Sequence, residues 1–367
     1  METQDYGRLC EPGTRRPLRS ITRVEAEERV GEELCALRTN SLSSAAPVGV
    51  TDTLLMASND RFYPVVDDIP ILLAPEAIGA ASDKMEFDLE QPAFHEAYLE
   101  MDFYNQVSNS LASDLDSSTN AKEIRRAKAL TQEHAFPAPE ELWVDATHDT
   151  SAQADGYREL GALDGKDVLQ IGGKGQQAVK LLVAGAANAW LVTPMVGEAH
   201  FALQLARYAG VEDRFNPVVG VAEQLPLIDT SVDAIFSIGC VHHFSMPEAM
   251  PEVYRVLTPG GAFAAVEPFR APMYDLGTKI LGKREANAFC YPMTPDRIAP
   301  IAENFDSSSV IHHGTFLRYL LIAASKVGVN LPPSKMLGIS KADDWIADRL
   351  HLRNHGSSVA LIGRKSA

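Results

Sequence analysis

The sequence has no long apolar run and no apolar segment near its start. None of its apolar stretches approaches the roughly 20 residues that a helix needs to cross a bilayer. The first residues, METQDYGRLCEPGTRRPLRS, lack the apolar core of a secretory signal. We therefore expect a cytoplasmic protein that neither spans nor binds a membrane.

Cysteine is scarce, and blocks of basic residues are absent. The four cysteines form no CxxC pair, which argues against a disulfide framework or a zinc site; they are Cys10, Cys35, Cys240 and Cys290. We expect no metal. With 49 acidic and 33 basic residues, the formal net charge is −16. This charge argues against broad binding to the phosphate backbone of nucleic acids.

What the chain does contain is a strand, a glycine turn and a helix in succession. The apolar run 168–171 leads into Gly172, Gly173 and Gly175, after which apolar residues recur at helical spacing. Glycine lets the backbone approach a ligand closely, and the N–H groups of the first helical turn face that ligand. The turn favours a nucleotide-like ligand, although such turns also occur as simple tight corners.

Apolar strands and helices continue to alternate after this turn. The expected strands are 168–171, 189–192, 215–221, 233–239 and 262–268, and a last one is expected at 357–365. Strands of continuous apolar character joined by helices indicate a parallel sheet that is covered on both faces. Ligands of such sheets bind beyond the carboxyl ends of the strands. The residues just after each strand are therefore the site candidates.

Two longer segments resemble class I S-adenosylmethionine-dependent methyltransferases. Residues 222–244 are similar to the family's Ala-Glu-x-Leu-Pro and His-His stretch, and residues 251–268 to its Arg-Val-Leu and Pro-Gly-Gly segment. The resemblance covers about residues 145–305 and is strongest to small-molecule methyltransferases. It implies an α/β fold: a Rossmann-like seven-stranded methyltransferase sheet with helices on both faces. It also implies S-adenosyl-L-methionine as cofactor and a small-molecule acceptor.

The resemblance places the cofactor against the glycine turn and the residues after the first four strands. The implied cofactor-binding residues are Gln170, Gly172, Gly173, Gly175, Thr193, Met195, Ala222, Glu223 and Cys240. Three acids that are usual in the family are replaced here by Gln170, Thr193 and Val221. Threonine makes weaker hydrogen bonds than a carboxylate, and losing the ribose contact would cost about 1–3 kcal/mol. Glu198 could replace the missing acid, or it could be a solvated acid favoured by the helix dipole.

The candidate catalytic residues follow the fourth and fifth strands: His243, His242, Glu267 and Arg270. Histidine titrates near neutrality, so either histidine could act as the general base toward a hydroxyl or amine acceptor. Alternatively, the histidine pair is structural. Arg270 could hold a substrate carboxylate in a bidentate way, or it could pair with Glu267. The residues at about 270–297 are expected to form a lid over the acceptor.

The domain organisation that we expect has four parts. They are a mobile lead over 1–20, a small α+β domain over 21–80, a helical cap or linker over 81–145, and the methyltransferase domain over 146–367. Tyr63, Pro64 and Val65 begin a stretch that resembles the zinc-ribbon-like domain accompanying many methyltransferases. Its zinc cysteines do not carry over, because Arg38 stands where one would be. This part is either a metal-free relic or a simple β-hairpin.

The primary hypothesis is S-adenosylmethionine-dependent methyl transfer to a small molecule, in a secondary-metabolite or cofactor pathway. Two alternatives stay open: a catalytically inactive binding or regulatory protein of the same fold, and a cofactor-binding enzyme of non-methylating chemistry. A dehydrogenase is disfavoured, because the turn lacks GxGxxG and no acid is placed to bind an NAD ribose. The extra helices near the C-terminus could form a homodimer contact.

Overall fold

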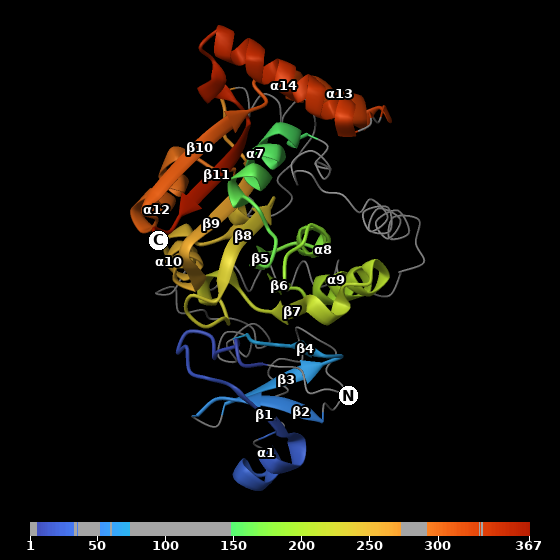
Figure 1. The fold of residues 1–367 in the computed structure, drawn as a ribbon, viewed down its shortest axis with the longest axis vertical. Coiled ribbons are helices and arrows are strands. Elements are labelled where there is room, and N and C mark those ends of the chain that lie inside the picture. The colour runs from blue at the N-terminus through green and yellow to red at the C-terminus, as the bar shows by residue number, and fades with distance from the viewer. Residues whose placement is uncertain are drawn as a thin grey trace, which may run out of the picture.

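The computed structural model describes residues 6–32, 35, 52–58, 61–73, 148–272, 292–329, 331 and 333–367. Figure 1 shows a large twisted sheet with helices on both faces and a small sheet formed by the N-terminal part of the chain. The expected helical cap over 81–145 lies outside the described residues. Of the expected lid, only 270–272 and 292–297 are described.

The large sheet has seven strands in the order β10-β11-β9-β8-β5-β6-β7. Their bounds are β5 Asp167–Ile171, β6 Asn188–Thr193, β7 Phe215–Val219, β8 Val232–Ile238, β9 Leu257–Pro268, β10 Ser307–His313 and β11 Ser358–Arg364. β11 is antiparallel to both of its neighbours, whereas β5 to β9 pair in parallel. The predicted seven-stranded Rossmann-like sheet is confirmed. Its strand order reverses between β5 and β8, where ligands of open α/β sheets bind.

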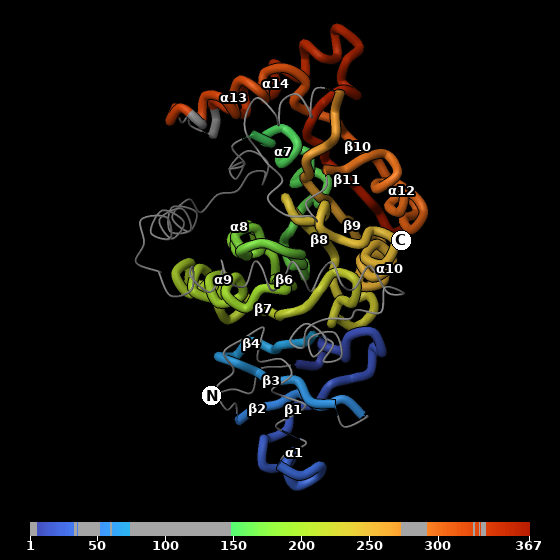
Figure 2. The backbone as a smooth tube through the Cα atoms, turned by 180° about the vertical axis from the view of Figure 1, so that it is seen from behind, coloured from blue at the N-terminus to red at the C-terminus, as the bar shows by residue number. Residues whose placement is uncertain are grey.

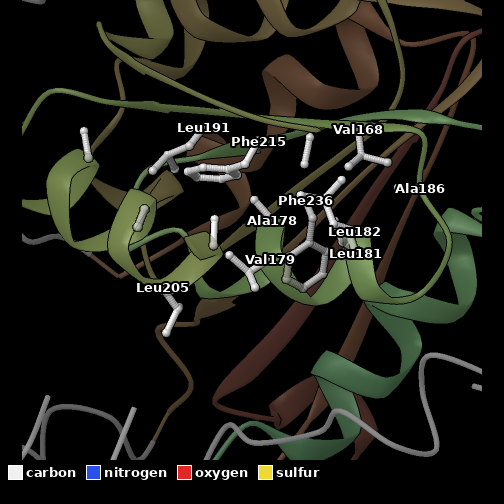
Figure 3. Packing of buried hydrophobic residues seen from close by; sticks show 14 of the residues in the cluster. Val168, Ala178, Val179, Leu181, Leu182, Ala186, Leu191, Leu205, Phe215 and Phe236 are labelled. Atoms are coloured by element: carbon white, nitrogen blue, oxygen red, sulfur yellow. The ribbon is translucent and has the colours of Figure 1, made fainter. Parts of the chain in front are cut away.

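The described helices of the large unit pack on the two faces of this sheet or, for the last two, beyond one of its ends beside α7 (Figure 1). They are α7 Thr150–Leu160, α8 Gln176–Val183, α9 Val196–Ala209, α10 Met246–Val256, α12 Pro295–Asn304, α13 Leu317–Lys326 and α14 Pro333–Arg349. α7, α8 and α9 cover one face, and α10 and α12 cover the other (Figures 1 and 2). Successive strand residues alternate between the two cores, so Val168 packs under α8 while Leu169 faces the opposite core (Figure 3). The central strands therefore carry apolar residues on both faces, as the sequence pattern indicated.

The N-terminal part forms a four-stranded antiparallel sheet. It comprises β1 Arg19–Thr22, β2 Thr53–Met56, β3 Phe62–Val66 and β4 Ile69–Pro70, with the helix α1 Arg23–Val30 after β1. Asp67 and Asp68 form the turn between β3 and β4, with φ of 49° and 65°. Aspartate tolerates this left-handed region better than most residues, so the turn forms without glycine.

The N-terminal sheet is joined to the large sheet at the strand β7. Ile71 forms a parallel bridge to Val219, and the Leu72 N–H donates to the Val219 carbonyl at 2.8 Å. Residues 6–20 also pack against the large unit, since Leu9 is 2% exposed and bridges Leu227. The expected mobile lead over 1–20 stays a prediction, although Leu9 within it is buried. The few apolar residues of this segment gave too weak a signal for burial.

The sequence pattern also did not indicate β10, which carries His313 at its end. The His313 Nδ1 lies 2.9 Å from Asp344 of α14, and its Nε2 lies 3.2 Å from Asp155 of α7 in an ion pair. Burial alone would lower the pKa of His313, but the two carboxylates outweigh it and raise that pKa. The His313 imidazole thus links α14 to the sheet and to α7, where α13 and α14 lie together (Figure 1).

Membrane insertion and metal binding find no support in the described segments. Among these residues no helix is both long and apolar enough to cross a bilayer. The same residues contain no group of three or more His, Cys, Asp or Glu that could hold a metal ion.

Candidate active site

A pocket lies at the carboxyl ends of β5, β6, β7 and β8, where the strand order reverses. It encloses about 790 Å³, part of it open to solvent. Its walls come from residues at the strand ends and in the loops that follow: Ile171, Gly172, Gly173, Val192, Pro194, Met195, Glu198, Gly220, Val221, Ala222, Glu223, Gly239, Cys240, His243 and Phe244. Six of the nine predicted cofactor-binding residues line it, namely Gly172, Gly173, Met195, Ala222, Glu223 and Cys240.

The glycine turn brings bare backbone to the pocket wall. Gly172 and Gly173 have φ of 75° and 73°, values that residues with a Cβ rarely adopt. A Cβ on Gly172 would lie 2.7 Å from the Cβ of Cys240, so the two strand ends could not approach as they do. Gly175 has a different role, because its Cβ would lie 2.3 Å from the Cβ of Ala202. It allows α8 to pack closely on α9.

Gln170 lies beneath the turn rather than in the pocket wall. Its Nε2 donates to the Gly172 carbonyl at 2.8 Å, and its Oε1 accepts the Ala178 N–H at 2.7 Å. The side chain is 3% exposed. The amide therefore supports the turn and the start of α8 by one bond to each, which a carboxylate could not do because it has no donor. A contact from Gln170 to the cofactor stays a prediction.

Thr193 and Glu198 form a pair at the end of β6. The fully buried Thr193 donates its hydroxyl hydrogen to the Glu198 Oε2 at 2.9 Å. Glu198, in the first turn of α9, lines the pocket, whereas Thr193 does not. Burial raises the pKa of Glu198, and the Thr193 hydrogen bond and the nearby Lys174 charge only partly oppose that rise. The acid of this part of the site thus comes from α9.

The segment after β7 forms a further wall of the pocket. Ala222 and Glu223 begin the short turn η2 Ala222–Gln224, and Glu223 is 6% exposed. Its Oε1 accepts the Ser245 N–H at 2.8 Å. This bond links the loop after β7 to the residue that precedes α10, so Glu223 holds two walls of the pocket together.

The loop after β8 carries the histidine pair on the turn η3 Val241–His243. His243 lines the pocket, and its ring centroid lies 4.1 Å from that of His242. His242 is 7% exposed and is not among the lining residues. Its Nδ1 lies 2.6 Å from the Glu267 Oε2. Of the two histidines, only His243 is therefore placed to meet a ligand in the described part of the pocket.

Glu267, near the end of β9, and Arg270, two residues after β9, make different contacts. Glu267 is 1% exposed, and its carboxylate is turned toward the loop after β8. Arg270 is exposed and does not line this pocket. Its backbone N–H donates to the Met293 carbonyl at 2.9 Å. The predicted pairing of Arg270 with a substrate carboxylate stays untested, because residues 273–291 lie outside the described ranges.

The sequence reasoning did not single out Gly220, Gly239 or Phe244, which also line the pocket. Gly220 directly follows β7, and Gly239 directly follows β8. The expected strands 215–221 and 233–239 included both glycines, so the rule that ligands meet the residues after each parallel strand pointed one or two residues too far along the chain. Phe244 closes the histidine turn and had no signal of its own.

Comparison with known proteins agrees with this geometry. A family model described as a methyltransferase domain matches residues 169–265, which include the glycine turn, the histidine turn and most of β9. The chain carries a methyltransferase domain over these residues. The match covers most or all of each of the five parallel strands β5 to β9, four of which end at the pocket, and it excludes the N-terminal sheet and the α13–α14 pair.

Several named proteins are similar to parts of this chain. A methyltransferase-like protein of Schizosaccharomyces pombe is 40% identical over 72 residues, which are 19% of this chain and 28% of that protein. A sterol 24-C-methyltransferase of Pneumocystis carinii is 32% identical over 123 residues, 31% of each chain. A ubiquinone/menaquinone biosynthesis C-methyltransferase of Methylobacterium nodulans is 30% identical over 167 residues, 38% of this chain and 65% of that one. The chain thus spans less than a third of the first two relatives.

Among solved structures, a geranyl diphosphate C-methyltransferase from Streptomyces coelicolor aligns with a TM-score of 0.44 and 18% identity. The alignment covers 59% of this chain and 76% of that one.

Proposed function

We propose that this protein transfers the methyl group of S-adenosylmethionine to a small-molecule acceptor. The observation that carries the proposal is a pocket at the sheet's switch point that combines a bare glycine turn with a half-buried carboxylate, Glu198. Both features suit a nucleoside that carries a cationic sulfur and a ribose diol. The methyltransferase domain over 169–265 supports the same conclusion.

The residues of the pocket fit this cofactor. The N–H groups and Cα atoms of Gly172 and Gly173 would lie against its amino-acid part, because no side chain keeps a ligand away from them. Glu198 would accept hydrogen bonds from the ribose hydroxyls in place of the acid that is missing at Thr193. The apolar Val221 and the adjoining Ala222 would border the adenine.

The reaction needs an aligned acceptor and a place for its proton. When bound, S-adenosylmethionine would supply an electrophilic methyl carbon to the acceptor. The electron pair of the broken C–S bond would stay on sulfur, so that S-adenosylhomocysteine is the leaving group. His243 lines the pocket and can take the proton that a hydroxyl or amine acceptor loses. Phe244 and the other apolar lining residues keep water from the site, which favours transfer to the acceptor over side reactions.

The pathway is the finer part of the proposal. Methyltransferases of sterol and quinone synthesis are among the partial relatives. We infer that the acceptor belongs to a secondary-metabolite or cofactor pathway and that the protein works in the cytoplasm. A homodimer through α13 and α14 stays a prediction.

The test is calorimetric titration with S-adenosylmethionine and S-adenosylhomocysteine. A screen then measures the S-adenosylhomocysteine released from S-adenosylmethionine when phenols, quinols, amines or carboxylates are offered as acceptors. We expect micromolar binding to the wild type and loss of binding in Gly172→Ala, whose Cβ would meet Cys240. Gly210→Ala is the matched control, because Gly210 shares a φ of 70° but has nothing within 4 Å. Each variant places a Cβ in the left-handed region at a cost of about 1–2 kcal/mol.

The outcomes separate the alternatives. No binding at millimolar cofactor by folded wild type would favour an inactive binding or regulatory protein. Tight binding without transfer to any acceptor class would favour non-methylating chemistry. Equal affinity of Gly172→Ala and wild type would show that the glycine turn is not the cofactor site.

A further inference from the structure

The loop that carries His243 is held by a single buried carboxylate. Glu267, near the end of β9, accepts the backbone N–H groups of Cys240 at 2.9 Å and Val241 at 2.7 Å on the same oxygen, Oε1. Its second oxygen, Oε2, lies 2.6 Å from the Nδ1 of His242. Three donors thus meet one side chain that has no exposed surface.

These contacts also define the state of the His242 ring. A carboxylate only accepts hydrogen bonds, so the Nδ1 that faces it must carry the proton. The ring is then fixed in position and in tautomer, as in other carboxylate–histidine pairs. Because the ring of His243 lies 4.1 Å away at an interplanar angle of 39°, the fixed His242 ring forms one wall for it.

The same loop is held from its other side by α12. Arg297 donates to the His242 carbonyl at 2.8 Å, so the backbone of the turn is bonded at both ends. Within the described residues, neither Glu267 nor His242 lines the pocket, whereas Cys240 and His243 do. A role of Glu267 in the reaction must therefore be exerted through the loop.

We propose that Glu267 and His242 are positioning residues that orient His243 as the group facing the acceptor. This rests on the proposed methyl transfer, and it reassigns two residues that the sequence suggested as catalytic. The Oε1 contacts fix the backbone of the turn, and the Oε2 contact fixes the ring against which His243 packs. His243 alone would then take the acceptor's proton.

Glu267→Gln separates these two contributions. The amide oxygen can still accept both backbone N–H groups, but the amide nitrogen is a donor and cannot accept from Nδ1. His242 must then turn over or adopt the Nε2–H tautomer, while the pocket wall at Cys240 is preserved. The matched control is Asp344→Asn, because Asp344 makes the same kind of bond to His313 at 2.9 Å outside the pocket.

Nitrogen-15 NMR of the protein saturated with S-adenosylhomocysteine reads the histidine tautomers without an acceptor. We expect Nδ1–H for His242 in the wild type, a changed tautomer in Glu267→Gln, and shifted His243 ring signals in that variant but not in Asp344→Asn. Affinity for S-adenosylhomocysteine should stay within about threefold of wild type. Unmoved His243 signals in Glu267→Gln would overturn the proposal. Failure of the wild type to bind S-adenosylhomocysteine would instead count against the proposed function.

Kinetics with an acceptor identified by the screen provide the second arm. We expect Glu267→Gln to lower kcat at least about tenfold with little change in KM for S-adenosylmethionine, since a correctly placed base contributes about 10²- to 10⁴-fold. Combining it with His243→Ala should cost nothing beyond His243→Ala alone, because both remove the same function. Multiplying effects in the double variant would contradict action through His243.

Discussion

Substituting Glu198 tests most directly whether its carboxylate binds the ribose of the cofactor. In this chain Thr193 ends β6, and the carboxylate comes from the first turn of α9, with its Oε2 held by the Thr193 hydroxyl at 2.9 Å. We predict that Glu198→Ala weakens binding of S-adenosylhomocysteine. A hydrogen bond to a charged group contributes about 1.5–3 kcal/mol, and about 1.4 kcal/mol corresponds to a tenfold change in Kd. The expected loss is therefore about 10- to 100-fold.

A compensating substitution makes this prediction specific. Thr193→Asp combined with Glu198→Ala returns the acid to the strand end, where the family usually carries it. We expect the double variant to recover at least about tenfold of the lost affinity. Glu248→Gln is the control, because Glu248 is an exposed acid in the first turn of α10 and is not part of the pocket. Its Kd should equal that of the wild type.

The pH dependence of binding follows from the raised pKa of Glu198. The ribose hydroxyls prefer the charged carboxylate, so affinity should be full above that pKa and should fall as the pH drops through it. Glu198→Gln should bind weakly with no such step. Calorimetric titration across pH 4.5–8 measures both curves. Wild-type affinity in Glu198→Gln, or the same acid step in both proteins, would refute the assignment.

Two further predictions concern the stability of the scaffold. His313→Gln should lower the melting temperature more at pH 6 than at pH 9: the raised pKa of His313 means that its protonated form stabilises the fold below the unfolded-state pKa, and that this contribution disappears as the pH rises through the folded-state pKa. Equal losses at both pH values would contradict a protonated bridge between the two carboxylates. Gly175→Ala should lower the free energy of unfolding in urea by about 2–5 kcal/mol, since it combines a left-handed alanine with a Cβ only 2.3 Å from that of Ala202. A loss below about 1 kcal/mol would mean that α8 and α9 can separate without cost.

The parallel core of the fold could be predicted from the sequence because its signals are local. Continuous apolar runs can only be strands buried on both faces, and the glycines after the run at 168–171 require a turn. The chain order of strands and helices then restricts the topology, and the rule for ligand sites identifies the strand ends. β10 gave no such signal: its Ser307, Ser308 and Ser309 are exposed at the edge of the sheet, where an apolar pattern is not needed.

The burial of the segment before residue 20 could not be predicted from the local sequence. Its burial depends on a partner surface, Leu227 and its neighbours, that lies some two hundred residues further along the chain. Local composition reports on what a segment can bury by itself, and this segment carries few apolar side chains. Backbone bonds hold the segment there directly, from the Cys10 N–H to the Pro226 carbonyl and from the Ile228 N–H to the Arg8 carbonyl.

The sequence alone could indicate which strand ends gather at the pocket, because residues that follow parallel strands meet at one edge of the sheet. It could not determine which side chains face the ligand. The tertiary structure shows that Gln170 supports the turn from below, that Glu198 lines the pocket beside the buried Thr193, and that His243 lines the pocket while His242 lies against Glu267. These choices depend on buried donors finding acceptors, such as two N–H groups and an imidazole that meet one carboxylate. Such satisfaction joins residues from different strands, and no spacing along the chain records it.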